Sequence, residues 1–458
     1  MVPCAMRAAI YGWAAVGALA LAACGGDDSS GGTAGAAGSA GTSSGGGGSG
    51  GGPTGGSGGL AGAGGSSASG GAGAGGAGGS GGAACVDTCP APGGGITWEC
   101  KKRFMYGINY AWKDFAGDFG GIAPWNIKGV SGQASAHQSA LADMRAHGVS
   151  VVRWWMFPDF RGDGVDFDST ETPTGLGGTA VADIQKALEL AEQADVYLML
   201  TVFSFDNFKP SEDVAGIWTP GITPMVKDAA KRKALLDKVV KPVAQTVAQS
   251  PYARRVVAWD VINEPEWAMI GSDPYGDPAF EADSTLAPVS FAEMETFVSE
   301  TVVALRSESQ ALITVGGAAA KWAKAWTKVG VDFYQLHIYD WVDKYWPHTN
   351  PASSYGLDKP IVMGELPPGP LNGVPYSSVV KSFWDQGYAG ALPWMYDGIS
   401  AGELDAVKAL ADGHVCETHY TQKANASVER VATTRALPPV RSVRRCSVVG
   451  GRPSCVRL

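Results

Sequence analysis

Short apolar runs alternate with amphipathic stretches along the chain between Cys100 and His414. The apolar runs predict eight strands, at positions 104–112, 150–157, 196–205, 256–264, 312–316, 333–339, 360–365 and 389–396. Several of these runs are apolar at nearly every position, as in Val196-Tyr197-Leu198-Met199-Leu200. Strands that are buried on both faces have this composition, and they are typical of parallel sheets.

Helical periodicity fills the intervals between these strands. The clearest helices lie at 138–146, 181–194, 229–248, 291–306, 377–384 and 403–411, whereas the patterns after the fifth and sixth strands are short or weak. Strand–helix alternation predicts βαβ units with right-handed crossovers. Eight such units close naturally into a barrel, so we predict an α/β fold, a (β/α)8 TIM barrel in one domain. The alternative, an open doubly wound sheet, would need a Gly-rich phosphate loop after the first strand, and positions 107–112 do not form one.

The N-terminal 24 residues have the features of an export signal. Arg7 supplies a positive charge, and the apolar run from Ala8 to Ala23, at 16 residues, is shorter than a membrane span of ~20. The run ends in Leu-Ala-Ala-Cys-Gly around Cys24, which looks like a bacterial lipobox with Cys24 as the lipidated residue. The alternative is an ordinary cleavable signal with a chance cysteine. We therefore expect an exported protein, lipid-anchored at the bacterial cell envelope (outer membrane or cell surface) or secreted.

The next segment, 25–84, consists almost only of Gly, Ala, Ser and Thr. This composition cannot bury enough apolar surface to fold, so we predict a disordered linker. A flexible chain of its 60 residues has an r.m.s. span of about 40–45 Å, which would hold a folded domain clear of a membrane surface. The predicted organisation is a signal peptide at 1–24, a linker at 25–84, a barrel domain at 85–416 and a tail at 417–458.

The formal net charge of −9 conceals an asymmetry. From Thr421 onward eight Lys and Arg stand against one acidic residue, so this part carries +7 and the rest of the chain −16. An acidic body is a poor nucleic-acid binder, because neutralising phosphates needs clustered Lys and Arg. A neutral polymer is not repelled. The basic tail shows neither helical nor strand period, so we expect it to be disordered or to form a small loop closed by Cys446 and Cys455.

Cysteine usage supports export. Apart from Cys4 and Cys24 the chain has six cysteines, an even number that indicates disulfides in an exported protein: Cys85, Cys89, Cys100, Cys416, Cys446 and Cys455. Cys416 follows the last predicted helix and can join the end of the barrel to any of the first three. The spacings fit no zinc pattern and the chain has no His-Glu-x-x-His pair, so we expect no metal and no cofactor. We also expect a monomer.

In a (β/α)8 barrel, chemistry takes place at the C-terminal ends of the strands. The residues at or just beyond the predicted ends include Asn109, Trp112, Arg153, Trp154, Trp155, Asp206, Asn207, Asn263, Glu264, Trp267, His337, Tyr339, Glu365 and Trp394. Glu264 and Glu365 end the fourth and seventh strands, which face each other across a closed barrel. Glycoside hydrolysis requires such a pair, one carboxyl to protonate the leaving oxygen and one to attack or to activate water.

On these residues the chain resembles the retaining β-glycosidases of clan A, and within them glycoside hydrolase family 5, the cellulase and mannanase family. The resemblance covers positions 104–414. Its most specific element is Trp259-Asp260-Val261-Ile262-Asn263-Glu264-Pro265, with Asn-Glu-Pro at a strand end, and Ile361-Val362-Met363-Gly364-Glu365 looks like the family's nucleophile strand. Four more positions fall where the family keeps an arginine, a His-x-Tyr pair and a platform tryptophan, namely Arg153, His337, Tyr339 and Trp394.

The resemblance implies a double displacement on a β-linked polysaccharide, a β-1,4-glucan or a β-mannan. Glu365 would be the nucleophile, kept ionised by Arg153 and oriented by Tyr339. Glu264 would be the acid/base, with a pKa raised by partial burial and by the negative charge of Glu365. Asn263 would donate to the sugar 2-hydroxyl, and retention predicts carboxyl groups about 5–5.5 Å apart.

The remaining candidates are less specific. His337 would hydrogen-bond near the acid/base or the sugar. After the third strand the family commonly places a histidine, where this chain has Asp206-Asn207, and either of these is a candidate sugar ligand. Trp394 and Trp112 are candidates to stack on sugar rings. One of Trp154 and Trp155 must face the core, because neighbours on a strand alternate, and two tryptophans are weaker candidates for an outer subsite, Trp341 and Trp346.

Two other function classes account for part of the pattern. A non-catalytic carbohydrate-binding barrel would keep the aromatic residues but would not need both glutamates. A metal-dependent deacetylase or amidohydrolase would need clustered His and Asp ligands at strand ends, where only His337 qualifies. Transglycosylation would use the same residues as hydrolysis, and the sequence does not separate the two.

Overall fold

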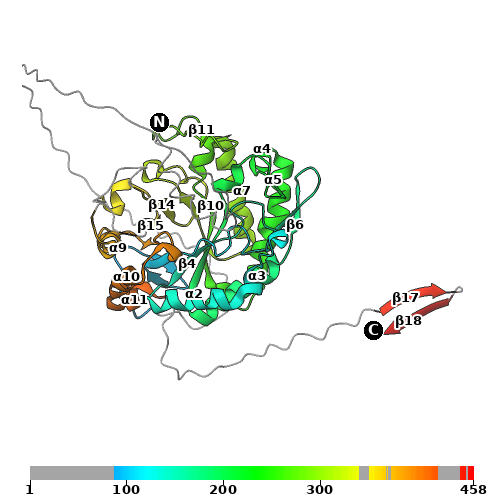
Figure 1. Cartoon of the computed structure of the whole chain (residues 1–458), viewed down its shortest axis with the longest axis horizontal. Helices are drawn as coiled ribbons and strands as arrows, with labels where there is room; N and C mark the ends of the chain where they lie inside the picture. Colours follow the sequence, from blue (N-terminus) through cyan, green and yellow to red (C-terminus); the bar gives the residue numbers. More distant parts are fainter. Residues whose placement is uncertain are drawn as a thin grey trace, which may run out of the picture. The chain divides into compact units, whose positions relative to one another are not determined.

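The computed structural model describes residues 87–339, 350–367, 369, 373–420, 444–449 and 452–457. Eight parallel strands form a closed barrel in chain order, in which the last strand pairs with the first (Figure 1). They are β3 (Met105–Asn109), β4 (Val151–Trp155), β7 (Tyr197–Ser204), β10 (Val256–Asn263), β13 (Leu312–Gly317), β14 (Tyr334–His337), β15 (Ile361–Glu365) and β16 (Gly390–Ala391). The predicted (β/α)8 barrel is confirmed, and each of its strands lies within or beside a predicted run.

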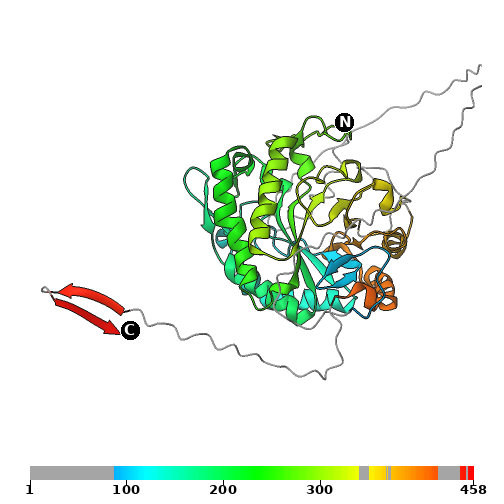
Figure 2. The ribbon, with the colours of Figure 1, turned by 180° about the vertical axis from the view of Figure 1, so that it is seen from behind.

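Helices flank the strands on the outside, with α2, α3, α5 and α7 on one side and α9 and α10 on the other (Figures 1 and 2). The helices are α2 (Ala134–Ala146), α3 (Ala180–Ala194), α4 (Thr223–Lys227), α5 (Ala229–Leu235), α6 (Lys241–Ala248), α7 (Phe291–Glu308), α9 (Tyr376–Asp385), α10 (Ala401–Gly413) and α11 (Val415–Thr418). The predicted helix at 229–248 contains a π-helical turn, η4 (Leu236–Val240), between α5 and α6. Pro242 lies two residues after the end of this turn, and its missing N–H interrupts the α-helical ladder there.

Short strands and 3-10 turns lie before, between and after the barrel strands in the chain. The extra strands are β1 (Ile96–Trp98), β2 (Lys101–Arg103), β5 (Val165–Phe167), β6 (Pro173–Leu176), β8 (Glu212–Val214), β9 (Ile217–Thr219), β11 (Met269–Ile270) and β12 (Val289–Ser290). The 3-10 turns are η1 (Ala123–Trp125), η2 (Val130–Gln133), η3 (Phe205–Phe208), η5 (Ala253–Arg255), η6 (Pro265–Ala268), η7 (Ala320–Trp322), η8 (Ala352–Tyr355) and η9 (Tyr396–Gly398). Within the described ranges, only η7 and η8 follow β13 and β14, in agreement with the weak helical pattern there.

Local sequence signals mark where two of the helices begin. Ser290 and Glu293 form a capping box at the start of α7, and Ser400 and Glu403 form another at the start of α10. In each box the serine accepts from the glutamate's backbone N–H and the glutamate accepts from the serine's backbone N–H. Such boxes satisfy backbone donors that the first helical turn leaves unpaired.

The N-terminal end of the barrel is closed and its C-terminal end carries the polar residues. The strands β7 and β10 are buried at all eight positions, as their continuous apolar composition predicts. A layer of apolar side chains fills the barrel toward its N-terminal end, including Met105, Val151, Tyr197, Met199 and Val362. The Tyr420 side chain joins this layer and donates a hydrogen bond to the Ile96 carbonyl, 3.2 Å away.

A disulfide joins Cys89 to Cys416. It links the segment before the barrel strands to the segment after them in the chain, and it resolves one of the pairings that the sequence left open. For the tail we expected disorder or a small loop closed by Cys446 and Cys455. Its described residues, β17 (Arg444–Val449) and β18 (Arg452–Arg457), form an antiparallel hairpin. Two glycines separate the strands in sequence, a composition that favours two-residue hairpin connections. Cys446 and Cys455 are paired in its register.

The predicted signal peptide, Cys24 and the linker lie outside the described residues. Among the helices that are described, none has the length and apolar character needed to cross a membrane.

Candidate active site

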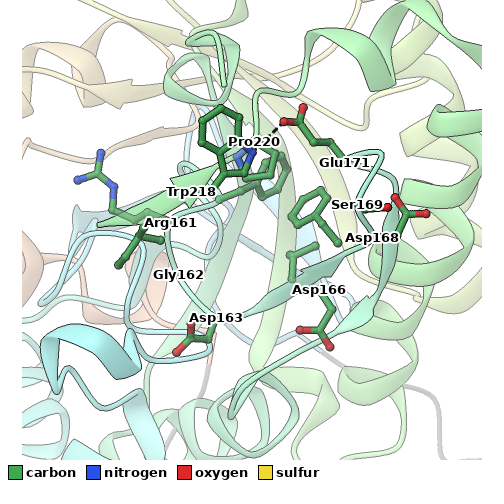
Figure 3. A pocket seen from close by; sticks show the side chains of 13 residues that line it. Arg161, Gly162, Asp163, Asp166, Asp168, Ser169, Glu171, Trp218 and Pro220 are labelled. Carbon is green, nitrogen blue, oxygen red and sulfur yellow. Dashed lines mark hydrogen bonds between the residues drawn. The ribbon is translucent and has the colours of Figure 1, made fainter. Parts of the chain in front are cut away.

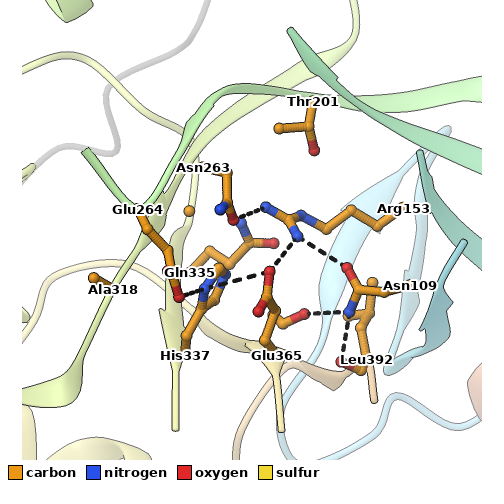
Figure 4. Close-up of polar contacts among 12 residues, drawn as sticks. Asn109, Arg153, Thr201, Asn263, Glu264, Ala318, Gln335, His337, Glu365 and Leu392 are labelled. Atoms are coloured by element: carbon orange, nitrogen blue, oxygen red, sulfur yellow. Dashed lines mark hydrogen bonds and ion pairs between the residues drawn. The ribbon is translucent and has the colours of Figure 1, made fainter. Parts of the chain in front are cut away.

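Glu264 and Glu365 lie at the C-terminal ends of β10 and β15, as the sequence predicts. The structure brings one oxygen of each carboxyl and a ring nitrogen of His337 within 4.8 Å of one another. Figure 4 shows the side chains of Glu264, His337 and Glu365 converging with Arg153 and Asn109. His337 stands opposite Glu365 because the register between β14 and β15 shifts by one residue there. Gly364 has no partner on β14 because of this shift, and the side chains of His337 and Glu365 therefore face the same site.

Glu365 is almost fully buried, at 4% exposure, and is held from two sides. Arg153 Nη1 lies 2.7 Å from Oε1, and the Tyr339 hydroxyl donates to Oε2 at 3.0 Å. On balance the pKa of Glu365 is raised, because burial, the largest cause, and the charge of Glu264 outweigh the lowering by His337, by the cationic Arg153 and by the hydrogen bond from Tyr339. The ion pair with Arg153 and the Tyr339 hydrogen bond act against this upward shift, since both favour the charged form of the carboxyl.

Glu264 has a different environment, with one hydrogen-bond partner on each carboxyl oxygen. The Trp267 indole N–H donates to Oε2 at 2.8 Å, and His337 Nδ1 lies 2.8 Å from Oε1. Its side chain is 13% exposed, so solvent or a ligand can reach it. Burial raises the pKa of Glu264 to about 7, partly offset by the Trp267 hydrogen bond and the charge of Arg153. A carboxyl with such a pKa can give up and take back a proton near neutral pH.

The backbone at Glu264 adopts a left-handed conformation, with φ of 48° and ψ of 49°. Residues other than glycine seldom adopt it, and it costs of order 1–3 kcal/mol where it occurs. The conformation ends β10 and starts the turn η6, in which Trp267 lies. It thus places the indole N–H of Trp267 against the Glu264 carboxyl three residues earlier.

His337 is fully buried and contacts both carboxyls, with Nδ1 2.8 Å from Glu264 and 3.5 Å from Glu365. Burial lowers the pKa of His337 to about 4, with the charge of Glu365 opposing this shift. The imidazole ring is therefore neutral at pH 7. Its Nδ1 forms a hydrogen bond with the Glu264 carboxyl and brings no positive charge to the site. Its other nitrogen, Nε2, has no hydrogen-bond partner within the described part of the chain.

Arg153 is the centre of a buried polar network that the strand-end pattern only partly revealed. Its guanidinium donates to Glu365, to Asn109 Oδ1 at 2.9 Å and to Asn263 Oδ1 at 2.8 Å. The remaining N–H groups donate to Asp260 Oδ2 at 2.9 and 2.7 Å. Burial lowers the pKa of this guanidinium, but Asp260 and Glu365 raise it further, so the net shift is upward and Arg153 stays charged.

Sequence reasoning missed Asp260, although the residue stands in the quoted Asn-Glu-Pro strand. Asp260 and Asn263 are three residues apart, and strict alternation along a strand would place them on opposite faces. The register between β10 and β13 shifts between these two residues, so both side chains reach Arg153. An irregularity of this kind re-aims side chains next to functional sites, and no residue type in the strand announces it.

A second buried glutamate, Glu266, lies two positions after Glu264. One of its oxygens accepts from the Ala318 backbone N–H at 3.0 Å and the other from the Trp326 indole at 2.7 Å. Burial raises the pKa of Glu266 to about 7, against the effect of these hydrogen bonds. Glu266 is fully buried, and through these two hydrogen bonds it connects the loops after β10 and β13.

Three indoles, which we call the indole wall, pack together beside Arg153, whose guanidinium carbon lies 5.5 Å from the centre of the Trp155 ring. The rings of Trp112, Trp155 and Trp394 contact one another at centroid distances of 5.2, 5.7 and 5.3 Å. Trp112 and Trp394 are half-buried, as expected of residues that can receive a ligand, whereas Trp155 is buried at 4% exposure. Trp154 points the other way and packs on Tyr110 outside the barrel. Trp341 and Trp346 lie outside the described residues.

The candidates after β7 have structural contacts of their own. The Asn207 side chain accepts the Ser204 backbone N–H at 2.8 Å and so closes the turn η3. Its amide nitrogen is buried without a hydrogen-bond partner among the described residues. Asp206 is paired with Lys209 at 3.0 Å. A sugar contact by Asn207 remains a prediction.

The cluster of Glu264, His337 and Glu365 has ligand atoms close enough together to hold a metal ion. The positive charge that an ion would bring is already supplied at this point, because Arg153 contacts Glu365 at 2.7 Å. The Trp267 indole also occupies one oxygen of Glu264. The arrangement therefore suits a pair of carboxyls, one of them ion-paired with Arg153, better than a metal centre.

No protein-family model matches the chain. The mannan endo-1,4-beta-mannosidase of Mytilus edulis is 24% identical over 339 residues, which cover 67% of this chain and 88% of that protein. The enzyme of the same name from Cryptopygus antarcticus is 22% identical over 355 residues, 67% of this chain and 84% of that protein.

Solved structures give the same picture of the fold. The β-mannanase from the blue mussel Mytilus edulis, 22% identical, superposes with a TM-score of 0.60 over 74% of this chain and 99% of that one. The β-1,4-mannanase from the sea hare Aplysia kurodai, 20% identical, superposes with a TM-score of 0.57 over 72% and 98%. The chain therefore has a (β/α)8 glycoside hydrolase fold, and it is similar in sequence to mannanases of animals.

Proposed function

We propose that this protein is a glycoside hydrolase of family 5, in clan A, that cleaves internal β-1,4 linkages of β-mannan with retention of configuration. The observation that carries the proposal is the carboxyl pair. Glu264 and Glu365 end strands on opposite sides of the barrel, their oxygens lie within 4.8 Å, and only Glu365 is ion-paired with an arginine. This spacing supports retention, for which carboxyl groups stand about 5–5.5 Å apart, because inversion needs roughly 6.5–9.5 Å to admit a water. The two similar mannosidases support mannan as the substrate.

In the first step the Glu365 carboxylate attacks the anomeric carbon of the sugar. The bond from that carbon to the glycosidic oxygen breaks, and the oxygen takes both the electron pair and the proton of Glu264. The products are a glycosyl ester on Glu365 and a free hydroxyl on the leaving sugar. Arg153 and Tyr339 hold Glu365 on both oxygens, so its lone pairs are directed before the substrate arrives.

In the second step water attacks the anomeric carbon while ionised Glu264 takes one of its protons. The ester bond to Glu365 breaks and its electron pair returns to the carboxylate, which restores the starting state. Glu264 changes from acid to base because the charge of the neighbouring Glu365 carboxyl changes between the two steps. The two carboxyls are coupled, since the charge of Glu264 raises the pKa of Glu365. When Glu365 is esterified its charge is gone, so the pKa of Glu264 falls and the group becomes a base.

Other residues of the site bind and orient the sugar. The Asn263 carbonyl oxygen accepts from Arg153, which leaves the amide group as a donor for the sugar 2-hydroxyl. Trp394 offers an indole face to the apolar side of the sugar ring, and Trp112 and Trp155 support it from behind.

The test is hydrolysis of linear mannan, galactomannan, glucomannan, carboxymethyl cellulose, xylan and laminarin by the whole protein. Glu264→Gln and Glu365→Gln should abolish cleavage, and Glu295→Gln on the outer helix α7 is the matched control. Product configuration is read by NMR in the first minutes of the reaction, and retention is expected.

Inverted product would overturn the double displacement. Cleavage of another glycan, with mannan left intact, would overturn the choice of substrate. Binding without cleavage would favour the non-catalytic carbohydrate-binding barrel.

We also propose export and lipid anchoring through Cys24. The Cys89–Cys416 disulfide supports export, because such bonds persist in oxidising compartments. Expression in a bacterium with labelled palmitate should label the parent and not Cys24→Ser, and that variant should lose its membrane association. Equal labelling of the two would refute the anchor.

A further inference from the structure

A second cavity lies among the loops that follow β4 and β7. It has a volume of about 550 Å³ and is bounded by the β5–β6 hairpin on one side and the β8–β9 hairpin on the other (Figure 3). Both hairpins belong to loops that follow barrel strands, so these loops start from the end of the barrel at which the carboxyl pair lies. The residues of this cavity, which we call the hairpin pocket, play no part in the chemistry described above.

Trp218 on β9 is a large, exposed aromatic residue that lines the hairpin pocket. Its side chain is 58% exposed, an unusual state for so large an apolar group. The indole does not hang free, because its N–H donates to Glu171 Oε1 at 2.9 Å, as Figure 3 shows. The other oxygen of Glu171 accepts from the Ser211 hydroxyl at 2.8 Å. The indole is thus fixed from the edge with a face left open, which is the arrangement that stacking on a ligand ring requires.

The rest of the lining is polar and acidic. The Asp166 side chain is exposed in the pocket and forms no hydrogen bond or ion pair in the described part of the chain. Asp163 uses one oxygen to accept the Ala123 backbone N–H, which leaves the other for a ligand. Carboxylates of this kind accept hydrogen bonds from hydroxyl groups and repel anions. They do not converge as the ligands of a metal would, since the metal-sized grouping found among the described residues is the one at the carboxyl pair.

A continuous wall of side chains connects the hairpin pocket to the carboxyl pair. Trp394 contacts Trp112 at 5.7 Å, Trp112 contacts Phe115 at 4.9 Å, and the Arg161 guanidinium lies 5.0 Å from the centre of the Phe115 ring. Arg161 lines the pocket and is held in place by Asp159 at 2.6 Å. These contacts link Trp394, through neighbouring side chains, to the edge of the hairpin pocket.

We propose that the hairpin pocket is a remote subsite that binds one neutral hexose ring of the substrate, stacked on Trp218 and hydrogen-bonded through its hydroxyls to Asp166 and Arg161. The inference rests on the proposed function, since it names the part of a β-mannan that the enzyme holds at a distance from the bond it cleaves. The ring can come from the main chain or from a side branch.

The test compares the whole protein with Trp218→Ala, and with Val303→Ala on α7, which truncates another exposed apolar side chain, 69% exposed, away from the pocket. The measurement is kcat/KM on manno-oligosaccharides from the trimer to the hexamer, on linear mannan and on galactomannan. For the long substrates Trp218→Ala should lower kcat/KM about tenfold, the factor that corresponds to 1.4 kcal/mol of lost binding. The trimer should be cleaved at the parent rate, and Trp218→Phe should keep most of the activity because it keeps a ring.

The substrates separate the two sources of the ring. A loss on the hexamer and on linear mannan assigns it to the main chain, and a loss confined to galactomannan assigns it to a branch. An unchanged Trp218→Ala on every substrate would overturn the subsite. So would an equal loss on the trimer and the hexamer with a lowered Tm, because the indole would then only stabilise the hairpin.

Binding without turnover distinguishes a failure of the subsite from a failure of the proposed function. Glu365→Gln and the double variant Glu365→Gln/Trp218→Ala are titrated with linear mannan and galactomannan. If the parent cleaves no mannan but Trp218→Ala weakens binding tenfold, the subsite stands and the enzyme proposal falls. If neither variant binds either glycan, the subsite falls as well.

Discussion

Asp260 is the residue whose replacement tests the buried network most directly. Its Oδ2 accepts from Arg153 twice, at 2.9 and 2.7 Å, and from the Thr201 hydroxyl and the Gln335 amide at 3.1 Å each. Its Oδ1 accepts the Gly316 backbone N–H at 2.8 Å. Both oxygens therefore face donors only. Asp260→Asn keeps the shape, removes the charge and puts an NH2 group where one oxygen was.

The cheaper orientation of the new amide keeps the oxygen toward Arg153 and turns the NH2 toward the Gly316 N–H. That leaves one buried backbone donor unpaired, which costs about 1–3 kcal/mol. Arg153, with no exposed surface, also loses one of its two counter-charges, and removing one partner of a buried ion pair costs about 3–5 kcal/mol. Because Glu365 still balances part of the charge, we expect a total loss of about 3–5 kcal/mol in the free energy of unfolding.

The assay is urea unfolding at pH 7, followed by tryptophan fluorescence, with the slope m compared between variants. Asp405→Asn on α10 is the matched control, because that side chain is 70% exposed and should change the free energy of unfolding by no more than about 0.5 kcal/mol. A loss below about 1 kcal/mol for Asp260→Asn, with m unchanged, would show that Arg153 does not depend on this carboxylate. The network as described would then be wrong.

Further predictions concern the acid/base, the indole wall and the disulfide. Because the pKa of Glu264 is raised to about 7 and the group acts first as an acid, kcat/KM should fall as the pH rises above that value, and it should also fall in acid as the Glu365 carboxylate is protonated; a flat profile to pH 9 would contradict the assignment of Glu264. Trp267→Phe removes a hydrogen bond that lowers this pKa, so the alkaline limb should move to higher pH. Trp394→Ala should lower kcat/KM on mannan about a hundredfold, equivalent to roughly 2.7 kcal/mol, with the Tm little changed. Replacing Cys89 and Cys416 together by Ala should lower the free energy of unfolding by about 2–5 kcal/mol relative to the oxidised parent, measured by urea unfolding; no difference between the two would refute it.

Much of the barrel follows from the order of residues along the chain. Continuous apolar runs predict buried strands, and serine–glutamate pairs such as Ser290 and Glu293 mark helix starts, because both signals arise between near neighbours. The eighth strand is shorter than its apolar run, since Pro393 cannot donate to the ladder and β16 ends at Ala391. The tail hairpin escaped prediction, because no amphipathic period marks its strands.

The placement of Glu264 and Glu365 in one site also followed from the sequence, because the ends of parallel strands in a closed barrel meet at one face. Their different environments did not. The Arg153–Asp260 pair, the neutral His337 and the Trp267 contact depend on two shifts of strand register and on one left-handed residue.

The linear sequence therefore determined which elements form and at which end of the barrel the carboxyls stand. Only the tertiary structure decided which carboxyl is paired with a cation, which tryptophan of two neighbours enters the site, and where the hairpin pocket lies. The physical reason is the separation along the chain between the residues that interact. Periodicity and capping act over a few residues, whereas ion pairing and burial join side chains that are far apart in the chain, such as Arg153 and Glu365 at 212 positions.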